Sequence, residues 1–214
     1  MKNKVEQSAE DLKHIRQMME QSNKFLSLSG LSGIVAGAIA LAGVFVARTL
    51  LHEFKIKNVE FVLQGTFYKE ADLLKYKLII LSAAILILAL GLGFIFTYLK
   101  TKKSNATLYS KTSLRVASAL FLPLAFGGFF TIILAKYDLF QLAAAATLIF
   151  YGMSLLNASK YLNIEIKYLA ITEMVLGVFA AYFLNEVMLL WAIGFGVMHI
   201  LYGSIMYFRY DRKK

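Results

Sequence analysis

Six long apolar stretches, nearly free of charge, alternate with short charged segments along this chain. They cover residues 25–47, 78–99, 116–135, 139–159, 168–185 and 187–208. Each is close to the roughly 20 residues that a helix needs to cross about 30 Å of hydrocarbon. Backbone amides find no water inside lipid, so such stretches must be helical. The pattern predicts an all-α, polytopic membrane protein with six transmembrane helices.

The connections between these stretches predict how the helices pair. Only Lys136, Tyr137 and Asp138 separate the third stretch from the fourth, and only Asn185 and Glu186 separate the fifth from the sixth. Connections this short make consecutive helices antiparallel neighbours. Together with the first two stretches, they predict three antiparallel hairpins.

Residues 1–24 precede the first apolar stretch and have a helical pattern of their own. Val5, Leu12 and Met19 recur every seven residues, and Ile15 lies on the same stripe. This spacing predicts an amphipathic helix on the cytoplasmic side. Two interpretations stay open: a surface for a protein partner or a second copy of the chain, and a helix lying on the membrane surface.

Residues 48–77 form the one sizeable segment between predicted helices on the opposite side. Apolar residues from Phe54 to Leu63 alternate in part with polar ones, which favours a short strand or a β-hairpin. Gly65 is the residue that we expect at its turn. The sequence therefore predicts an extracytoplasmic loop with some strand structure.

The chain is basic, with 23 Lys and Arg against 13 Asp and Glu, a formal net charge of +10. Most of the basic residues outside the spans lie in the N-terminal segment, the second and fourth connections and the tail 209–214. Because Lys and Arg concentrate in cytoplasmic loops, both termini are predicted to be cytoplasmic. The basic segment 48–77 runs against this rule. Membrane topology accounts for the charge, so no nucleic-acid partner is predicted.

Two ionisable residues fall inside the predicted spans, Glu173 in the fifth and His199 in the sixth. Charged groups inside a membrane are costly and usually face the bundle interior with a partner. Helix geometry places Tyr202 almost level with Glu173 and His199 about one turn away. We expect a hydrogen-bonded Glu173–Tyr202–His199 cluster, which either holds two helices together or binds a proton or ligand.

Small residues and the single proline predict where helices pack and bend. Ser29, Gly33, Gly37 and Gly43 have the spacing that lets two helices approach closely. They fit packing inside the bundle or a dimer interface. Proline removes a backbone hydrogen bond and kinks a helix, so we expect the third span to bend. Its candidate hinge residues are Pro123, Gly127 and Gly128.

Tyrosines gather toward the predicted cytoplasmic ends of the helices, and Tyr151 is one of them. Trp191 lies near the outer end of the sixth helix. Both residue types are typical of the membrane–water interface, and we interpret them in this way.

No catalytic signature is present. The chain has no cysteine, no phosphate-binding glycine loop, and no metal-ligand spacing among His14, His52 and His199. We therefore predict a protein that is not an enzyme and that has no cofactor and no metal.

The segment 25–37, Phe-Leu-Ser-Leu-Ser-Gly-Leu-Ser-Gly-Ile-Val-Ala-Gly, follows Met18-Met19-Glu20. This opening resembles that of a group of uncharacterised bacterial six-helix membrane proteins, mainly over the first fifty residues. The resemblance implies a bacterial cytoplasmic membrane and the same topology, and it transfers no functional residues. We expect a non-enzymatic sensing, scaffolding or accessory protein in contact with membrane lipids. The alternative is a small transporter or channel that uses Glu173 and His199.

Overall fold

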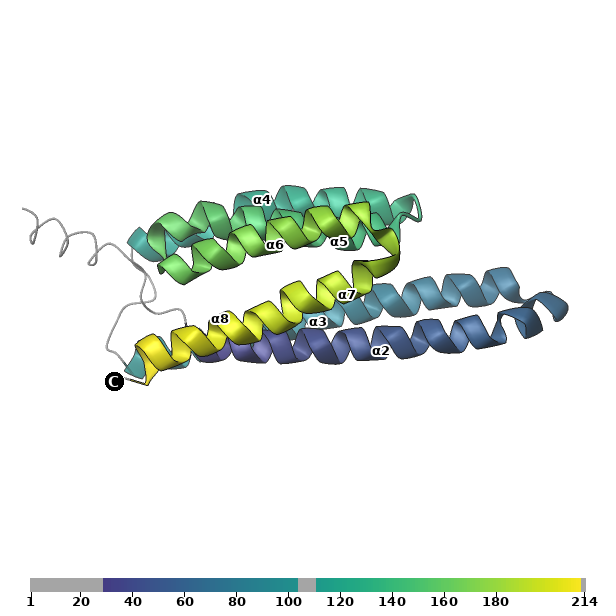
Figure 1. Ribbon diagram of the computed structural model, residues 1–214, viewed down its shortest axis with the longest axis horizontal. Helices are drawn as coiled ribbons and strands as arrows, with labels where there is room; N and C mark the ends of the chain where they lie inside the picture. The colour runs from purple at the N-terminus through teal and green to yellow at the C-terminus, as the bar shows by residue number, and fades with distance from the viewer. Residues whose placement is uncertain (1–28, 104–110, 213–214) are drawn as a thin grey trace, which may run out of the picture.

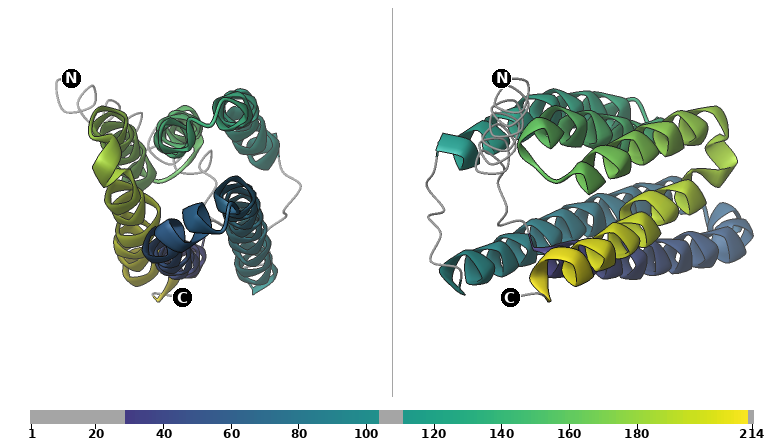
Figure 2. Two further views of the ribbon diagram at one scale, coloured as in Figure 1. Left: turned by 90° about the vertical axis from the view of Figure 1, so that its right-hand side faces the viewer. Right: turned by 60° about the vertical axis from the view of Figure 1, so that its left-hand side comes forward.

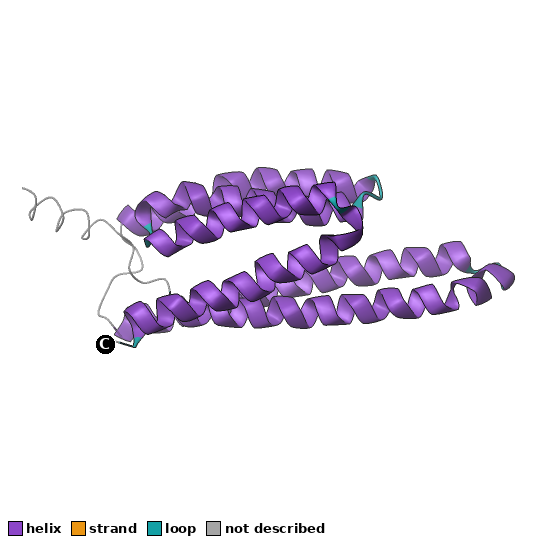
Figure 3. Ribbon diagram, in the orientation of Figure 1, coloured by secondary structure: helices purple, strands orange, loops and turns teal. Residues whose placement is uncertain are grey.

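The computed structural model describes residues 29–103 and 111–212, and every regular element within them is a helix (Figure 3). The first five are α2 (Gly30–Leu63), α3 (Phe67–Lys103), α4 (Lys111–Lys136), α5 (Phe140–Ala158) and α6 (Ile164–Tyr182). Two short 3-10 helices flank α6, η1 (Ser159–Tyr161) before it and η2 (Leu184–Glu186) after it. The last four segments are α7 (Val187–Trp191), the π-helical η3 (Ala192–Met198), α8 (His199–Met206) and η4 (Tyr207–Asp211). These four follow one another without a break, and we call them together the C-terminal helix, residues 187–211.

Five of these helices are long and apolar enough to cross a membrane: α2, α3, α4, α5 and the C-terminal helix. The 19 residues of α6 differ from them because they include Glu165, Lys167 and Glu173. All-helical architecture is therefore confirmed, with five helices of membrane-spanning character in the described part of the chain.

The helices form two layers (Figures 1 and 2). In one layer α5 packs between α4 and α6, and in the other α2 packs against α3 and the C-terminal helix. The C-terminal helix begins beside α6 at their shared corner and then runs along α2 for most of its length. Helix α6 and the C-terminal helix, which the second tight turn joins, are therefore neighbours mainly near that turn. The C-terminal helix connects the two layers.

The prediction of a strand within residues 48–77 is wrong. Helix α2 continues to Leu63 and α3 begins at Phe67. Gly65, with a φ of 70°, lies at the turn between them, as expected. Phe54 contacts Phe61 at 5.8 Å between ring centroids. These two are seven residues apart, a helical spacing that the partial alternation obscured.

The α2–α3 hairpin is longer than a membrane is thick. The 34 residues of α2 extend about 51 Å at 1.5 Å per residue, against about 30 Å of hydrocarbon. Figure 1 shows the hairpin projecting beyond the other helices. The segment predicted as a loop is therefore the helical tip of this hairpin.

Two other predicted boundaries also change. The amphipathic helix of residues 1–24 lies outside the described residues. The tail predicted for residues 209–214 is helical as far as Asp211, and both Arg209 and Asp211 have charged partners on other helices. Arg209 pairs with Glu165 at 2.8 Å and Asp211 with Lys100 at 2.7 Å. These pairs hold the last turn of the C-terminal helix against both layers.

The candidate packing residues lie at contacts between helices. A Cβ added at Gly33 would be 3.1 Å from Gly203 Cα, and one added at Gly37 would be 2.6 Å from the Gly196 carbonyl oxygen. Gly43 faces Ile85 of α3 in the same way. Close approach of backbones is how helices associate in lipid. The first two glycines therefore let α2 contact the C-terminal helix within one chain.

Helix α4 continues through Pro123, and a side chain of α5 compensates for the proline. Proline has no N–H, so the carbonyl of Ala119, four residues earlier, loses its helical donor. The Asn157 amide donates a hydrogen bond of 2.9 Å to this carbonyl. Beyond the proline, Gly127 faces Phe150 of α5, and nothing lies within 4 Å of a Cβ at Gly128. The carbonyl freed by the proline is thus satisfied within the protein, as a low-dielectric environment requires.

Gly203→Ala should destabilise the protein even though alanine favours a helix. Its Cβ would lie 2.7 Å from the backbone nitrogen of Ile34, and overpacking of this kind costs about 1–3 kcal/mol. The matched control is Gly91→Ala, because no atom lies within 4 Å of that position. Thermal unfolding in detergent should show a loss for the first variant and no loss for the second. Equal effects would contradict the close contact.

Asn157→Leu should lower the free energy of unfolding by about 1 kcal/mol, in the range measured for hydrogen bonds between membrane helices. In a Pro123→Ala background the Ala119 carbonyl regains its helical donor, so the same substitution should then have almost no effect. Unfolding in detergent of the wild type, the two single variants and the double variant measures this coupling. Additive effects would show that Asn157 does not compensate for the proline.

Candidate functional site

Glu173 lies at the midpoint of α6 and is completely buried, with a relative exposure of 0%. Neither of its carboxyl oxygens has a hydrogen-bond partner among the described residues. Gly194 of the C-terminal helix faces it, and a Cβ there would lie 2.6 Å from Oε2. It would also lie 2.6 Å from a methyl group of Leu148. The carboxyl group therefore fills a space that exists because residue 194 has no side chain.

His199 is the polar side chain that comes closest to this carboxyl group. Its Nδ1 lies 3.4 Å from Oε1 of Glu173 and 3.1 Å from the carbonyl oxygen of Gly194. A carbonyl can only accept, so Nδ1 carries the hydrogen. On the other edge of the ring, Nε2 lies 2.9 Å from the Tyr151 hydroxyl, which donates to it when the ring is neutral. Tyr151, His199 and Glu173 thus form a chain, which we call the buried carboxyl cluster.

The shape of the C-terminal helix positions this cluster. Residues Ala192–Met198 are π-helical, a widened helix that is rare and often occurs at functional sites. Trp191, Phe195 and His199 follow at intervals of four, with 4.7 Å between the first two ring centroids and 5.8 Å between the last two. The Trp191 indole donates a 3.1 Å hydrogen bond to Thr147 of α5. The aromatic face of the C-terminal helix is thereby held against α5.

The structure brings together two of the three residues predicted for the site. Glu173 and His199 are in contact, whereas Tyr202 packs against an apolar cluster nearer the C-terminal end. The tyrosine at His199 is Tyr151, from α5, which we had interpreted as an interfacial residue. The prediction considered only the two helices that share a corner, so a tyrosine from a third helix was missed.

Glu173 also lies further from the start of its helix than the predicted boundary places it. The sequence places the start of the fifth helix at Tyr168, whereas α6 begins at Ile164. Nine residues separate Ile164 from Glu173, about 13–14 Å at 1.5 Å per residue. The difference arises because the buried Glu165 was assigned to the preceding connection.

Glu165 is a second buried carboxylate, and it contrasts with Glu173. It accepts hydrogen bonds from Arg209 at 2.8 Å and from the Tyr210 hydroxyl at 3.0 Å. Its negative charge is therefore matched, whereas Glu173 faces a single histidine. In residues 29–103 and 111–212 no group of three His, Asp or Glu side chains could hold a metal ion.

The hinge candidates do not belong to this cluster. Pro123, Gly127 and Gly128 lie on α4, which packs mainly against α5. Their proposed role in bending stays a prediction.

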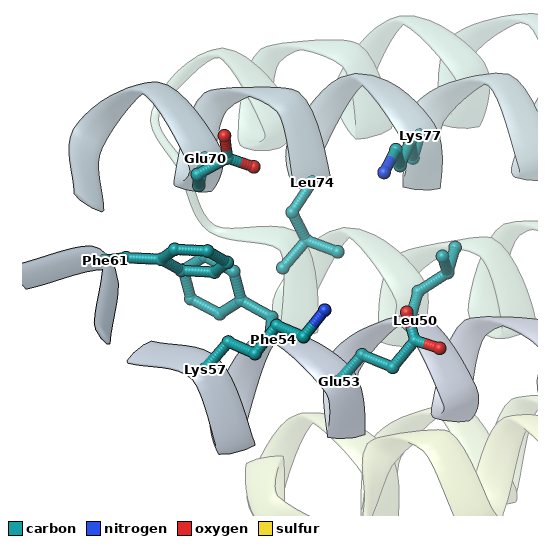
Figure 4. Close-up of a pocket in the computed structure, with 8 residues that line it drawn as sticks. All are labelled: Leu50, Glu53, Phe54, Lys57, Phe61, Glu70, Leu74 and Lys77. Atoms are coloured by element: carbon teal, nitrogen blue, oxygen red, sulfur yellow. The ribbon is translucent and has the colours of Figure 1, made fainter. Parts of the chain in front are cut away.

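Two cavities lie on the α2–α3 hairpin, away from Glu173. One, of about 180 Å³, is lined by Phe45, Arg48, Thr49 and His52. The other, of about 140 Å³, lies between the two helices (Figure 4). Its lining combines four apolar and four charged side chains: Leu50, Phe54, Phe61, Leu74, Glu53, Lys57, Glu70 and Lys77. Neither includes a residue of the buried carboxyl cluster.

Comparisons with family models, curated proteins and solved structures find no match to this chain.

Glu173 and His199 should be energetically coupled. The single variants Glu173→Gln and His199→Phe and the double variant form a cycle in which phenylalanine keeps the ring contacts. Residues in contact show coupling of about 0.5–3 kcal/mol. We expect a coupling of this size in thermal unfolding at neutral pH. Additive effects would mean that the two side chains do not interact.

Proposed function

We propose that this chain is a protein of the bacterial cytoplasmic membrane with six transmembrane helices and both termini in the cytoplasm. The five long apolar helices support this directly. Helix α6 fits as the sixth, because α5 and the C-terminal helix cover it and because its Glu165 and Glu173 are buried rather than exposed to lipid. The distribution of Lys and Arg supports the orientation.

We infer that the protein is a non-enzymatic sensor whose buried carboxyl cluster takes up and releases a proton. The observation that carries this inference is the complete burial of Glu173 with no hydrogen bond to either oxygen from residues 29–103 or 111–212. An intramembrane carboxylate with so little compensation is costly, and such residues mark proton relays or ligand sites. A proton is the ligand that fits a site without surrounding space.

The position of the cluster supports sensing in particular. His199 and Gly194 belong to the C-terminal helix, which packs against α2 in one layer and against α5 and α6 in the other. A change of charge on Glu173 therefore acts on the element that connects the layers. Such a protein, surrounded by membrane lipids, would respond to acidity by a change in the relative position of its two helix layers.

A small proton-coupled transporter is the second candidate. The π-helical segment opposite Glu173 favours it, because such segments often occur at functional sites. The complete burial of Glu173 favours the sensor. The two proposals differ in one measurable property, net flux of protons or of a coupled solute across the membrane.

A hydrophobic carbodiimide, which reacts with protonated carboxyl groups in apolar surroundings, provides the test. In proteoliposomes with the same pH on both sides, modification of Glu173 should decrease as the pH rises. Glu165 is the internal control, since Arg209 and Tyr210 bind its carboxyl group and should make it much less reactive. Mass spectrometry of the peptides that contain each residue measures both.

Two outcomes would contradict these proposals. Modification of Glu173 that does not change with pH, or that equals modification of Glu165, would contradict proton uptake. Proton flux in proteoliposomes that is lost in Glu173→Gln would favour the transporter over the sensor. We expect no flux above that of protein-free liposomes.

A further inference from the structure

The second half of α2 has an apolar face that points away from α3. Phe54 and Phe61 lie on the opposite face, where they line the cavity between α2 and α3 (Figure 4). A helix turns by about 200° over two residues, so the residues two positions before and after these phenylalanines lie on the face away from α3. Six residues follow one another on that face at alternating intervals of four and three. We call them the α2 seam: Phe45, Thr49, His52, Ile56, Val59 and Leu63.

The α2 seam is exposed. Ile56 and Val59 are each 66% exposed, and Leu63 is 83% exposed. The glycine contacts of α2 with the C-terminal helix are at Gly33 and Gly37, closer to the start of α2. Figure 1 shows the later part of the hairpin projecting beyond the other helices. A row of large apolar side chains that nothing covers marks an interaction surface.

The spacing of the α2 seam is that of a coiled coil. Alternating intervals of three and four residues form a heptad repeat, in which the seam residues are the a and d positions. Thr49, Ile56 and Leu63 are then at a, and the other three are at d. A helix with such a repeat packs against a second helix of the same kind, side chain into gap. The seam therefore fits a helical partner.

Charged residues of opposite sign flank the two edges of the α2 seam. Arg48 and Lys55 lie along one edge, at the g positions, and Glu53 and Glu60 lie along the other, at the e positions. Among residues 29–103 and 111–212 no ion pair includes any of these four. Charges at these positions set the partner and the orientation of a coiled coil.

The charges match a second copy of α2 in parallel orientation. In a parallel pair, a g residue of one helix meets the e residue five positions further along the other. Arg48 would meet Glu53 of the second copy, and Lys55 would meet Glu60. Two-fold symmetry repeats both contacts, which makes four pairs of opposite charge. An antiparallel pair would instead bring basic edge to basic edge and acidic edge to acidic edge.

The cavity of about 180 Å³ lies at the beginning of the α2 seam. Its lining residues, Phe45, Arg48, Thr49 and His52, follow one another at intervals of three, one and three. In a coiled coil, four residues of one helix form the hole that receives one seam side chain of the facing helix. In a parallel pair in register, the side chain that enters this hole is Thr49 of the second copy. The cavity therefore has the lining that such a pair requires.

We propose that the α2 seam joins two copies of this chain as a parallel, two-stranded coiled coil over residues 45–63. The membrane gives both copies the same orientation, as parallel pairing requires. It also confines them to one layer, which raises the effective concentration of the partner and compensates for a coil of fewer than three heptads. The inference depends on the proposed membrane setting and not on proton uptake by Glu173.

Cross-linking tests the contact, because the chain has no cysteine of its own. Two cysteines form a disulfide only when their Cα atoms are within about 7 Å. In oxidised membranes of cells that express the full chain, Val59→Cys should give a disulfide-linked dimer. The matched control is Tyr76→Cys on α3, because Tyr76 is also 66% exposed, and it should give none above background.

Three outcomes of this experiment would overturn the inference. They are equal cross-linking at both positions, no cross-linking at either, and a cross-link from Val59→Cys to a protein of different mass. A dimer from Val59→Cys that forms even when Glu173→Gln is also present would show that pairing and proton uptake are separate properties, as we expect.

Charge exchange tests the orientation in the Val59→Cys background. Glu53→Lys with Glu60→Lys makes both edges basic. Each pair of this kind shifts an equilibrium by roughly twofold, and like charges oppose it by a similar factor. Reversal of four pairs should therefore reduce the equilibrium constant for dimerisation, read from the yield of disulfide-linked dimer, by at least about tenfold.

Adding Arg48→Glu and Lys55→Glu to that variant restores four pairs of opposite charge. The yield of dimer should then return toward that of Val59→Cys alone, which would also show that the exchanged protein folds and inserts. If the yield stays low although circular dichroism shows an unchanged helix content, parallel pairing through these charges is overturned.

Discussion

The burial of one carboxyl group is the constraint on which this structure depends. Glu173 needs a space without water, a neighbour that can share a hydrogen and helices on both sides of α6. Gly194 supplies the space, His199 the neighbour, and α5 with the C-terminal helix the cover. Removal of a charge from water is expensive. The residue at position 194, the position of His199 and the packing of α5 and the C-terminal helix must therefore all fit the buried carboxyl group.

The two-layer arrangement follows from this need. A C-terminal helix packed only on α6 would cover Glu173 but would lose its contact with the α2–α3 hairpin. Its glycines allow it to do both, since Gly194 faces α6 whereas Gly196 and Gly203 face α2. The same helix thus has one surface for a polar contact and another for close backbone packing.

The sequence predicted an all-helical chain and placed Glu173 near His199, because hydropathy and a short corner determine these features locally. The expected hydrogen bonds of Glu173 to His199 and Tyr202 are not found among the described residues. The sequence did not predict Tyr151 at His199, since contact between helices distant along the chain depends on tertiary packing. The helical tip of the α2–α3 hairpin was missed for a different reason. Residues Phe54 and Phe61 fit both a strand alternation and a heptad, and only packing against α3 distinguishes the two.

The length of α2 has a mechanical consequence. Its contact with the C-terminal helix includes Gly37, and its far end at Leu63 lies 26 residues away, about 39 Å along a stiff rod. A small tilt at the contact therefore becomes a large sideways displacement of the tip. In the membrane setting that we propose, a movement near Glu173 would in this way become motion of the hairpin tip outside the bilayer, where water-soluble molecules can detect it.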